Sequence, residues 1–309
     1  MNQDLTAQEF TRLANNFYNI NGVVANYDRI ALDSHLLNYI AIHKEEMKKS
    51  FKVALCCICL NASYWPYAKE IITGAKQFFL PGHKVDYFLW SDMPDTNYGS
   101  TIFPTEPVEW PLPTLLRHSL FLQQEEKLRE YDYVFYCDVD MRFVNVVGDE
   151  ILGEGLTAAQ HPMYALRKEF WPPYEPNEKS ASYVKRPGKL VIMEGKQRFM
   201  PLYYAGGFQG GKTDEWIKAM KVMKKMIEKD FMINYIPIWN DESVWNKYLS
   251  EHEPSVVLTP SYIYPDSLIE EYYKKIWGCD YQPKLITLTK KFSVSSDGGE
   301  AVKKMIQTL

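Results

Sequence analysis

The sequence predicts an α/β fold, and two features of the chain carry this prediction. The run at 51–60 is apolar over the length of a strand, as expected for a strand buried on both faces of a sheet, and a second strand at 85–90 and a third, buried strand at 131–140 are expected to follow it. Segments with helical periodicity lie between these strands. Such alternation is typical of a parallel sheet whose strands are joined by right-handed helical crossovers.

The elements divide the chain into three parts. Residues 1–50 are expected to form an N-terminal helical extension, because apolar residues recur there near helical spacing and a charged stretch follows. Residues 51–292 form the main domain, with helices expected over 66–79, 115–130 and 213–229. Thr114 is a plausible N-cap for the second of these helices. Residues 293–309 are expected to form a loose tail.

The second half of the main domain is more irregular. The stretch 171–201 is rich in Pro, Lys and Glu, which predicts a long polar loop. A strand at 202–212 is expected to turn into a run of glycines. A short helix should follow Trp239, and two short strands are expected within 256–266 and 284–292.

Composition excludes several classes of protein. The 35 basic and 39 acidic residues give a net charge of −4, so no basic surface is expected for binding a nucleic acid. The first residues lack the pattern of a signal peptide, and no apolar run has the roughly 18 residues of a membrane span. We therefore expect a soluble, cytoplasmic protein without a transmembrane segment. The crowded Cys56, Cys57 and Cys59 are expected to be buried thiols, because neighbouring strand residues point to opposite faces.

Asp138 and Asp140 are the first residues with a chemical signature. They follow a buried strand, and the carboxyl ends of parallel strands are where such sheets bind ligands. Side chains two apart in an extended segment share a face, so a cation between the two carboxylates would relieve their repulsion. Oxygen ligands suit Mn²⁺ or Mg²⁺. The alternative is a pair of solvated or helix-capping acids.

A strand that ends in Asp-x-Asp also resembles the haloacid-dehalogenase phosphatases. In that family the residue two positions after the second Asp is Thr or Val, whereas Arg142 stands there in this chain. In those phosphatases the motif also lies near the start of the catalytic domain, whereas here it follows two earlier predicted strands. A phosphatase is therefore the less favoured hypothesis.

A second carboxylate signal lies in the segment Trp239-Asn240-Asp241-Glu242. Glu242, among aromatic residues, could attack or stabilise an oxocarbenium ion at a sugar carbon. Its alternative role is to favour the start of a helix, where the helix dipole stabilises acidic side chains.

A third signal is the glycine-rich run that follows Tyr203 and Tyr204. Four glycines fall within 206–211, more than a simple turn requires. Glycine lets the backbone approach a ligand closely, although the pattern is not that of a phosphate-binding loop. A flexible hinge is the alternative.

These motifs occur in a recognisable order. Asp138-Val139-Asp140-Met141, then His161-Pro162, then the Tyr-Tyr-Ala-Gly-Gly run at 203–207, then Trp239 to Ser243 resemble the family 6 glycosyltransferases over roughly 52–292. This family includes the blood-group A and B transferases and the α-1,3-galactosyltransferases. The resemblance implies a GT-A fold, with a Rossmann-like mixed sheet flanked by helices. It also implies a retaining transfer of N-acetylgalactosamine or galactose, in α-1,3 linkage, from a UDP-sugar to an oligosaccharide acceptor of β-galactoside type.

The resemblance also assigns roles to residues. Asp138 and Asp140 match the manganese-binding pair, Glu242 the carboxylate at the anomeric carbon, and Asp241 and Arg117 residues that contact the donor sugar. His161 and Trp239 match acceptor-binding residues. Further donor contacts are implied at Ile58, Cys59, Leu60, Tyr64, Val139, Ala205, Gly206 and Gly207, and at one of Lys290 and Lys291.

The chain departs from the family pattern in its N-terminal part and in the loop between His161 and Tyr203, which is longer than expected. The eukaryotic members carry an N-terminal membrane anchor and a stem, which are not expected here. Some bacterial relatives lack the two acids and need no metal, whereas this chain retains Asp138 and Asp140. A glycan-binding protein that has lost catalysis remains a further alternative, although every candidate acid is present.

Overall fold

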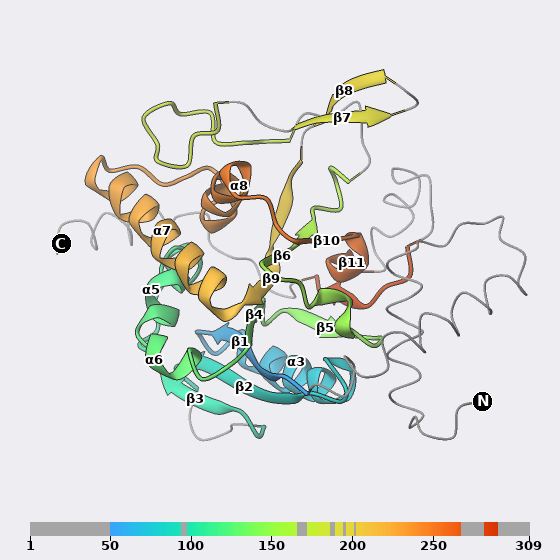
Figure 1. Cartoon of the computed structure of the whole chain (residues 1–309). Coiled ribbons are helices and arrows are strands. Elements are labelled where there is room, and N and C mark those ends of the chain that lie inside the picture. The colour runs from blue at the N-terminus through green and yellow to red at the C-terminus, as the bar shows by residue number, and fades with distance from the viewer. Residues whose placement is uncertain are drawn as a thin grey trace, which may run out of the picture.

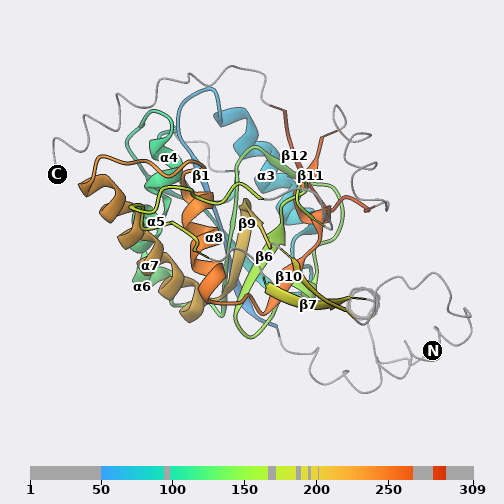
Figure 2. The ribbon, with the colours of Figure 1, turned by 90° about the horizontal axis from the view of Figure 1, so that it is seen from above.

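The computed structural model describes residues 50–93, 98–165, 172–185, 189–193, 196–200, 202–266 and 281–289. Apart from Ser50, the predicted N-terminal extension at 1–50 lies outside these residues, and so does the predicted tail at 293–309. Within the described residues, helices cover both faces of a central sheet, as Figures 1 and 2 show from two directions.

The main sheet has seven strands in the order β10-β6-β9-β4-β1-β2-β3. All neighbouring strands are parallel except β9, which runs antiparallel to both β4 and β6. The sheet is therefore mixed. Its strands are β1 (Lys52–Cys59), β2 (Lys84–Ser91), β3 (Thr101–Pro104), β4 (Tyr133–Cys137), β6 (Leu156–Gln160), β9 (Tyr204–Lys212) and β10 (Val256–Leu258).

The three strands predicted in the first half of the main domain are β1, β2 and β4, of which β4 is the central strand and β2 lies next to the edge strand β3. Strand β1 is buried on both faces: Val53 and Leu55 belong to one core cluster, and Ala54 and Cys56 to the other. The described cysteines, at 56, 57, 59 and 137, are free and buried. They serve as small apolar side chains, as predicted.

Helices form a layer on each side of the sheet. Helix α3 (Trp65–Phe78) packs Ala68, Ile71 and Ile72 into one core cluster. Helices α7 (Thr213–Met232) and α8 (Asp241–Glu251) lie on the other side, where Trp216 and Trp245 are fully buried. In the part of the chain that the structure describes, no helix is both long and apolar enough to cross a membrane.

The helix expected over 115–130 is instead three short helices, α4 (Leu112–Leu115), α5 (Arg117–Leu122) and α6 (Glu125–Leu128). A continuous helix would carry Glu126 onto the stripe that begins at Leu115, with Glu125 beside it. The chain turns before α6, so that these acids stay at the surface while Leu128 reaches the core. Thr114 therefore lies inside α4 and is not an N-cap.

The glycine-rich run is strand, not a turn or a hinge, and close packing explains two of its members. A Cβ at Gly210 would lie 2.3 Å from the ring of Phe135 on β4. At Gly211, with φ of +139°, a Cβ would lie 2.2 Å from the carbonyl oxygen of Gly155. Because β9 is sandwiched between β4 and β6, these positions accept no side chain.

The stretch 171–201 contains more order than a long polar loop. Its later part forms a two-stranded antiparallel sheet of β7 (Lys189–Met193) and β8 (Lys196–Met200). Residues 172–185 are tied to α7 through Asp230, whose carboxylate accepts hydrogen bonds from the Ser180 hydroxyl and the Ala181 amide, both at 2.7 Å. The polar composition of this stretch therefore supplies specific buried hydrogen bonds.

A small second sheet completes the fold. It consists of β11 (Tyr264–Pro265), β12 (Leu285–Thr287) and β5 (Met141–Phe143), in that order. Strand β5 directly follows the Asp138–Asp140 segment, and β12 runs antiparallel to it. The main-chain amide of Leu288 donates a hydrogen bond of 2.9 Å to the Asp140 carbonyl. This bond holds the Asp138–Asp140 segment against the residues that follow β12.

Candidate active site

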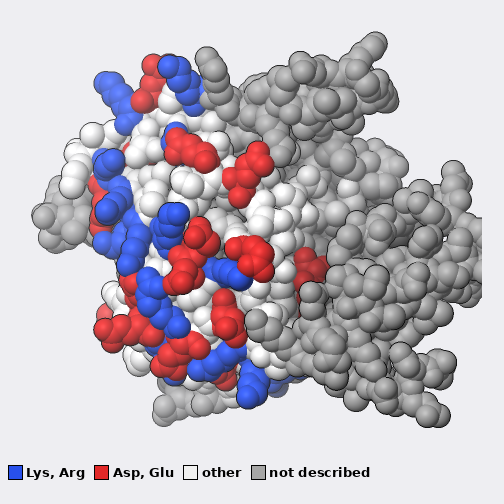
Figure 3. Space-filling model, in the orientation of Figure 1, with Lys and Arg blue, Asp and Glu red and all other residues white. Residues whose placement is uncertain are grey.

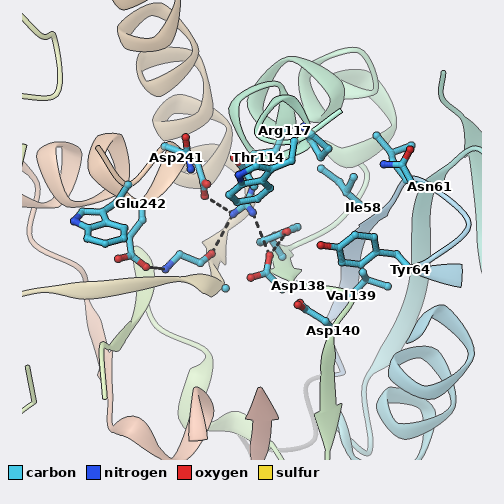
Figure 4. A pocket seen from close by; sticks show the side chains of 18 of the residues that line it. Ile58, Asn61, Tyr64, Thr114, Arg117, Asp138, Val139, Asp140, Asp241 and Glu242 are labelled. Atoms are coloured by element: carbon cyan, nitrogen blue, oxygen red, sulfur yellow. Dashed lines mark hydrogen bonds and ion pairs between the residues drawn. The ribbon is translucent and has the colours of Figure 1, made fainter. Parts of the chain in front are cut away.

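A cavity of about 700 Å³ opens where β1 and β4 end, and β9 and the first turn of α8 close it on the far side. This is the edge at which α/β sheets bind ligands. Figure 4 shows Asp138 and Asp140 on one side of the cavity and Asp241 and Glu242 on the other, with Arg117 between them. The two acidic motifs of the sequence therefore meet in one site.

Arg117 connects the two halves of the cavity. Its Nη1 lies 2.7 Å from Oδ2 of Asp241 and donates to the Gly206 carbonyl at 3.1 Å. Its Nη2 lies 3.1 Å from Oδ1 of Asp138. The guanidinium carbon stands 4.0 Å from the centre of the Tyr136 ring. A buried cation thus compensates two carboxylates, and a planar fork with several donors suits this task.

Asp138 and Asp140 could hold a divalent cation together with phosphate oxygens. Both line the cavity and both are partly exposed to it. Among the described residues there is no group of three or more His, Cys, Asp or Glu side chains suited to a metal ion. A pair of carboxylates completed by a diphosphate and water is a common arrangement for Mg²⁺ and Mn²⁺, so the residues present fit such an ion.

Glu242 stands in the first turn of α8, where its Oε2 accepts a hydrogen bond of 2.9 Å from the Gly206 amide. Burial raises the pKa of Glu242 to about 7, against the opposing effect of that amide. Burial likewise raises the pKa of its neighbour Asp241 to about 6, although Arg117 favours the charged form. Both acids occupy the helix start and still face the cavity, so capping and catalysis do not exclude one another here.

His161 and Trp239 lie on the wall of the same cavity. Burial lowers the pKa of His161 to about 4, so its ring is neutral at physiological pH. Its Nδ1 accepts the Met163 amide at 3.2 Å, which leaves Nε2 as the protonated nitrogen. The Trp239 side chain is 47% exposed, so its ring is available to contact a bound molecule.

The structure brings most of the predicted site residues together. Those that line the cavity are Ile58, Leu60, Tyr64, Arg117, Asp138, Val139, Asp140, His161, Gly206, Gly207, Trp239, Asp241 and Glu242. Cys59 and Ala205 do not line it, because both side chains are buried in the core cluster beside α3. Lys290 and Lys291 lie outside the described residues, and a role for either stays a prediction.

Other residues at the cavity were not expected from the motifs, namely Asn61, Ser63, Glu109, Trp110, Pro113, Thr114 and Tyr136. A signal for Tyr136 was present in the sequence. It stands two residues before Asp138 and therefore points from the strand to the same face. Residues at 109–114 lie in irregular chain, where no periodicity indicates the direction of a side chain.

The surface over α6 and α7 carries both signs of charge, as Figure 3 shows. Lys221 is paired with Glu125 at 2.7 Å, and Lys224 with Glu228 at 2.6 Å. Such exposed pairs contribute little stability, but they leave no extended patch of one sign on this part of the surface.

The mixed seven-stranded sheet, with its acidic cavity at the ends of β1 and β4, defines a protein of the GT-A-like α/β class. The family model described as glycosyltransferase family 6 matches residues 118–278, slightly more than half of the chain. The chain belongs to this family.

Curated relatives agree with this assignment. Histo-blood group ABO system transferase 1 of Rattus norvegicus is 32% identical over 218 residues, which cover 67% of this chain and 59% of the relative. Globoside alpha-1,3-N-acetylgalactosaminyltransferase 1 of Homo sapiens is 30% identical over 216 residues, or 66% of this chain and 58% of the relative. The chain thus spans about three fifths of these relatives. O-antigen biosynthesis glycosyltransferase WbnI of Escherichia coli is 28% identical over 225 residues, which cover 71% of this chain and 90% of the relative.

Proposed function

We propose that this chain is a retaining glycosyltransferase, which moves N-acetylgalactosamine, or galactose, from a UDP-sugar to the 3-hydroxyl of a galactoside-type acceptor. The observation that carries the proposal is the Arg117 bridge between Asp138 and Asp241. This bridge places Asp138 and Asp140, which suit a cation bound with a diphosphate, on one side of the cavity. Glu242, a carboxylate suited to act at an anomeric carbon, lies on the other side. Family membership supports the same reaction class.

The reaction exchanges one bond at the sugar carbon C1 for another. The bond from C1 to the diphosphate oxygen breaks, and its electron pair leaves with UDP. The acceptor oxygen forms the new bond to C1, and its proton passes to the departing diphosphate. The ionised carboxylate of Glu242 either attacks C1 first or stabilises the positive charge that develops there. A divalent cation held by Asp138 and Asp140 would neutralise charge on the leaving group.

The choice of donor sugar is a further part of the proposal. Gly206 and Gly207 line the cavity with backbone alone, and the atom nearest to a Cβ built on Gly207 is Oδ2 of Asp138, at 2.8 Å. From the absence of bulk at these two positions we infer a preference for UDP-N-acetylgalactosamine over UDP-galactose. The preference should be modest, because spare room excludes the smaller sugar only weakly; a single group in a pocket discriminates by about 1–3 kcal/mol.

A donor and acceptor screen tests the proposal. Purified protein is incubated with each UDP-sugar, Mn²⁺ and a panel of galactosides, while UDP release is measured and the product linkage is assigned by NMR. We expect UDP release that depends on the acceptor, a product with an α-1,3 linkage, and loss of activity in excess EDTA.

The same screen separates the alternatives. Binding of a glycan without any UDP release, across all donors, would identify a glycan-binding protein instead. Release of phosphate from a simple ester, in the absence of any UDP-sugar, would identify a phosphatase. A β-linked product would still identify a glycosyltransferase, but it would exclude the retaining mechanism.

A further inference from the structure

Tyr136 lies in the cavity but belongs to none of the sequence motifs. It is the next-to-last residue of β4, and its ring packs against Phe121 with centroids 5.5 Å apart. The ring also stands 4.0 Å from the guanidinium carbon of Arg117. Its hydroxyl donates a hydrogen bond to Oδ1 of Asp138. The Tyr136 side chain therefore touches both the guanidinium of Arg117 and the carboxylate of Asp138.

Packing alone accounts for the ring but not for the hydroxyl. A phenylalanine would fill the same space against Phe121 and would keep the same contact with the guanidinium of Arg117. The hydroxyl adds only the hydrogen bond to the Asp138 carboxylate. Hydrogen bonds to an ionised acceptor are stronger and more directional than those between neutral groups, so this contact fixes the orientation of the carboxylate.

The two oxygens of Asp138 consequently have different surroundings. Oδ1 accepts from the Tyr136 hydroxyl and from Nη2 of Arg117, the latter at 3.1 Å. Oδ2 lies over Gly207, where a methyl group added to the glycine would come within 2.8 Å of it. Both donors that reach the Asp138 carboxylate bind Oδ1, whereas Oδ2 accepts no hydrogen bond from the described residues, so Oδ2 is the oxygen left for a ligand in the cavity that Asp138 lines.

We propose that Tyr136 is a positioning residue, whose hydroxyl holds Oδ1 of Asp138 so that Oδ2 is presented to the cation bound with the diphosphate. This inference rests on the proposed function of the same cavity. The hydroxyl also withdraws some negative charge from the carboxylate, which by itself would weaken cation binding. Orientation outweighs that effect, because without the hydroxyl Oδ1 keeps only the donor from Arg117 and the carboxylate must be ordered when the cation binds.

The test compares Tyr136→Phe with the wild-type protein. Mn²⁺ binding in the presence of saturating UDP is measured by the loss of the free-ion signal in electron paramagnetic resonance. We expect the dissociation constant for Mn²⁺ to rise roughly tenfold, the size expected for one hydrogen bond to a charged group. The melting temperature and the weak binding of UDP without metal should stay close to wild type.

Tyr131→Phe is the matched control. The Tyr131 hydroxyl donates to Oδ2 of Asp86 at 2.7 Å, a contact of the same chemical kind at a site that does not line the cavity. Mn²⁺ affinity should be unchanged in this variant. An equal loss of affinity in both variants would show a general effect on folding and would overturn the proposal.

The remaining outcomes are also decisive. If Tyr136→Phe binds Mn²⁺ as tightly as wild type, or more tightly, the hydroxyl does not position Asp138 and the inference is wrong. If the wild-type protein binds neither UDP nor Mn²⁺ with UDP, the proposed function fails before Tyr136 is tested. The two failures are therefore distinguishable.

Discussion

Nη1 of Arg117 lies 2.7 Å from Oδ2 of Asp241, a contact that ties α5 to the first turn of α8. The Arg117 side chain is only 4% exposed, and the same guanidinium reaches Asp138. The catalytic geometry of the cavity and the stability of its wall therefore depend on one buried cation.

Replacing this cation should damage both properties. Arg117→Met leaves Asp138 and Asp241 without their shared partner, and removal of one member of a buried ion pair costs about 3–5 kcal/mol of unfolding free energy. Transfer activity should fall at least a hundredfold. Urea unfolding and UDP release measure the two effects. Arg129→Met, which breaks the exposed pairs with Glu125 and Asp214, is the control and should cost less than about 1 kcal/mol.

Glu242→Gln should separate catalysis from binding. A group beside the anomeric carbon acts mainly on the transition state, so kcat should fall by a factor on the order of a hundred or more while UDP affinity changes little. Glu251→Gln provides the control, because Glu251 ends the same helix and is 51% exposed, paired with Lys247. Near-normal kcat in Glu242→Gln would reduce Glu242 to a residue that favours the helix start.

The dependence on pH should have opposite signs for activity and for stability. Burial raises the pKa of Glu242 to about 7 from 4.5, and that of Asp241 to about 6 from 3.8. Activity needs the ionised carboxylate of Glu242, so kcat should fall as pH drops below about 7. The folded protein binds these protons more readily than the unfolded chain does. Protonation of Asp241 and Glu242 therefore adds to the free energy of unfolding. This contribution is complete below the pKa values of the unfolded chain and is lost as pH rises through about 6–7.

Two measurements check these signs. A profile of kcat against pH should show the acid limb, and urea unfolding from pH 4.5 to 8 should show the loss of stability. In Glu242→Gln the unfolding free energy should vary less with pH, and the difference from wild type isolates this one carboxyl group. A kcat that stays constant from pH 7 to 5 would contradict the assignment.

Gly207→Ala should alter more than the donor choice. The added methyl group would lie 2.8 Å from Oδ2 of Asp138, so the carboxylate must shift. We expect the ratio of kcat/KM for the two donors to move towards UDP-galactose, and Mn²⁺ affinity to fall with it. Gly74→Ala in α3 adds a methyl group at ordinary contact distance, 3.4 Å from Phe143, and should change neither property. A wild-type preference of at least tenfold for UDP-galactose would show that room at 207 does not set the choice.

Glu175 should affect the acceptor without affecting the donor. This buried carboxylate accepts from the Tyr235 hydroxyl at 2.6 Å and from the Ile238 amide at 2.8 Å, directly before Trp239. Glu175→Gln retains the size of the side chain but weakens this anchor, so KM for the acceptor should rise several-fold. Binding of UDP with Mn²⁺ should be unchanged, and an equal loss of donor and acceptor affinity would indicate general unfolding.

The sequence alone determined the layers of the fold and most of the site. Burial on both faces requires unbroken apolar runs, so β1 and β4 could be predicted, and the end of β4 placed Asp138 and Asp140 at the ligand edge. The order of motifs supplied Glu242, and the family resemblance that it revealed supplied Arg117. The resemblance also implied donor contacts at Cys59 and Ala205, whose side chains point into the core, as the alternation of side chains along a strand leads one to expect beside the cavity residues Ile58 and Gly206.

Tertiary structure alone decided how these residues act together. Nothing in the local sequence indicates that Arg117 bridges Asp138 and Asp241, because the three belong to separate elements that meet only when the sheet is assembled. The same holds for Gly210, whose missing side chain is explained by the ring of Phe135 on a neighbouring strand. Periodicity records which side of an element is buried, whereas the partner across that surface is set by packing between distant parts of the chain.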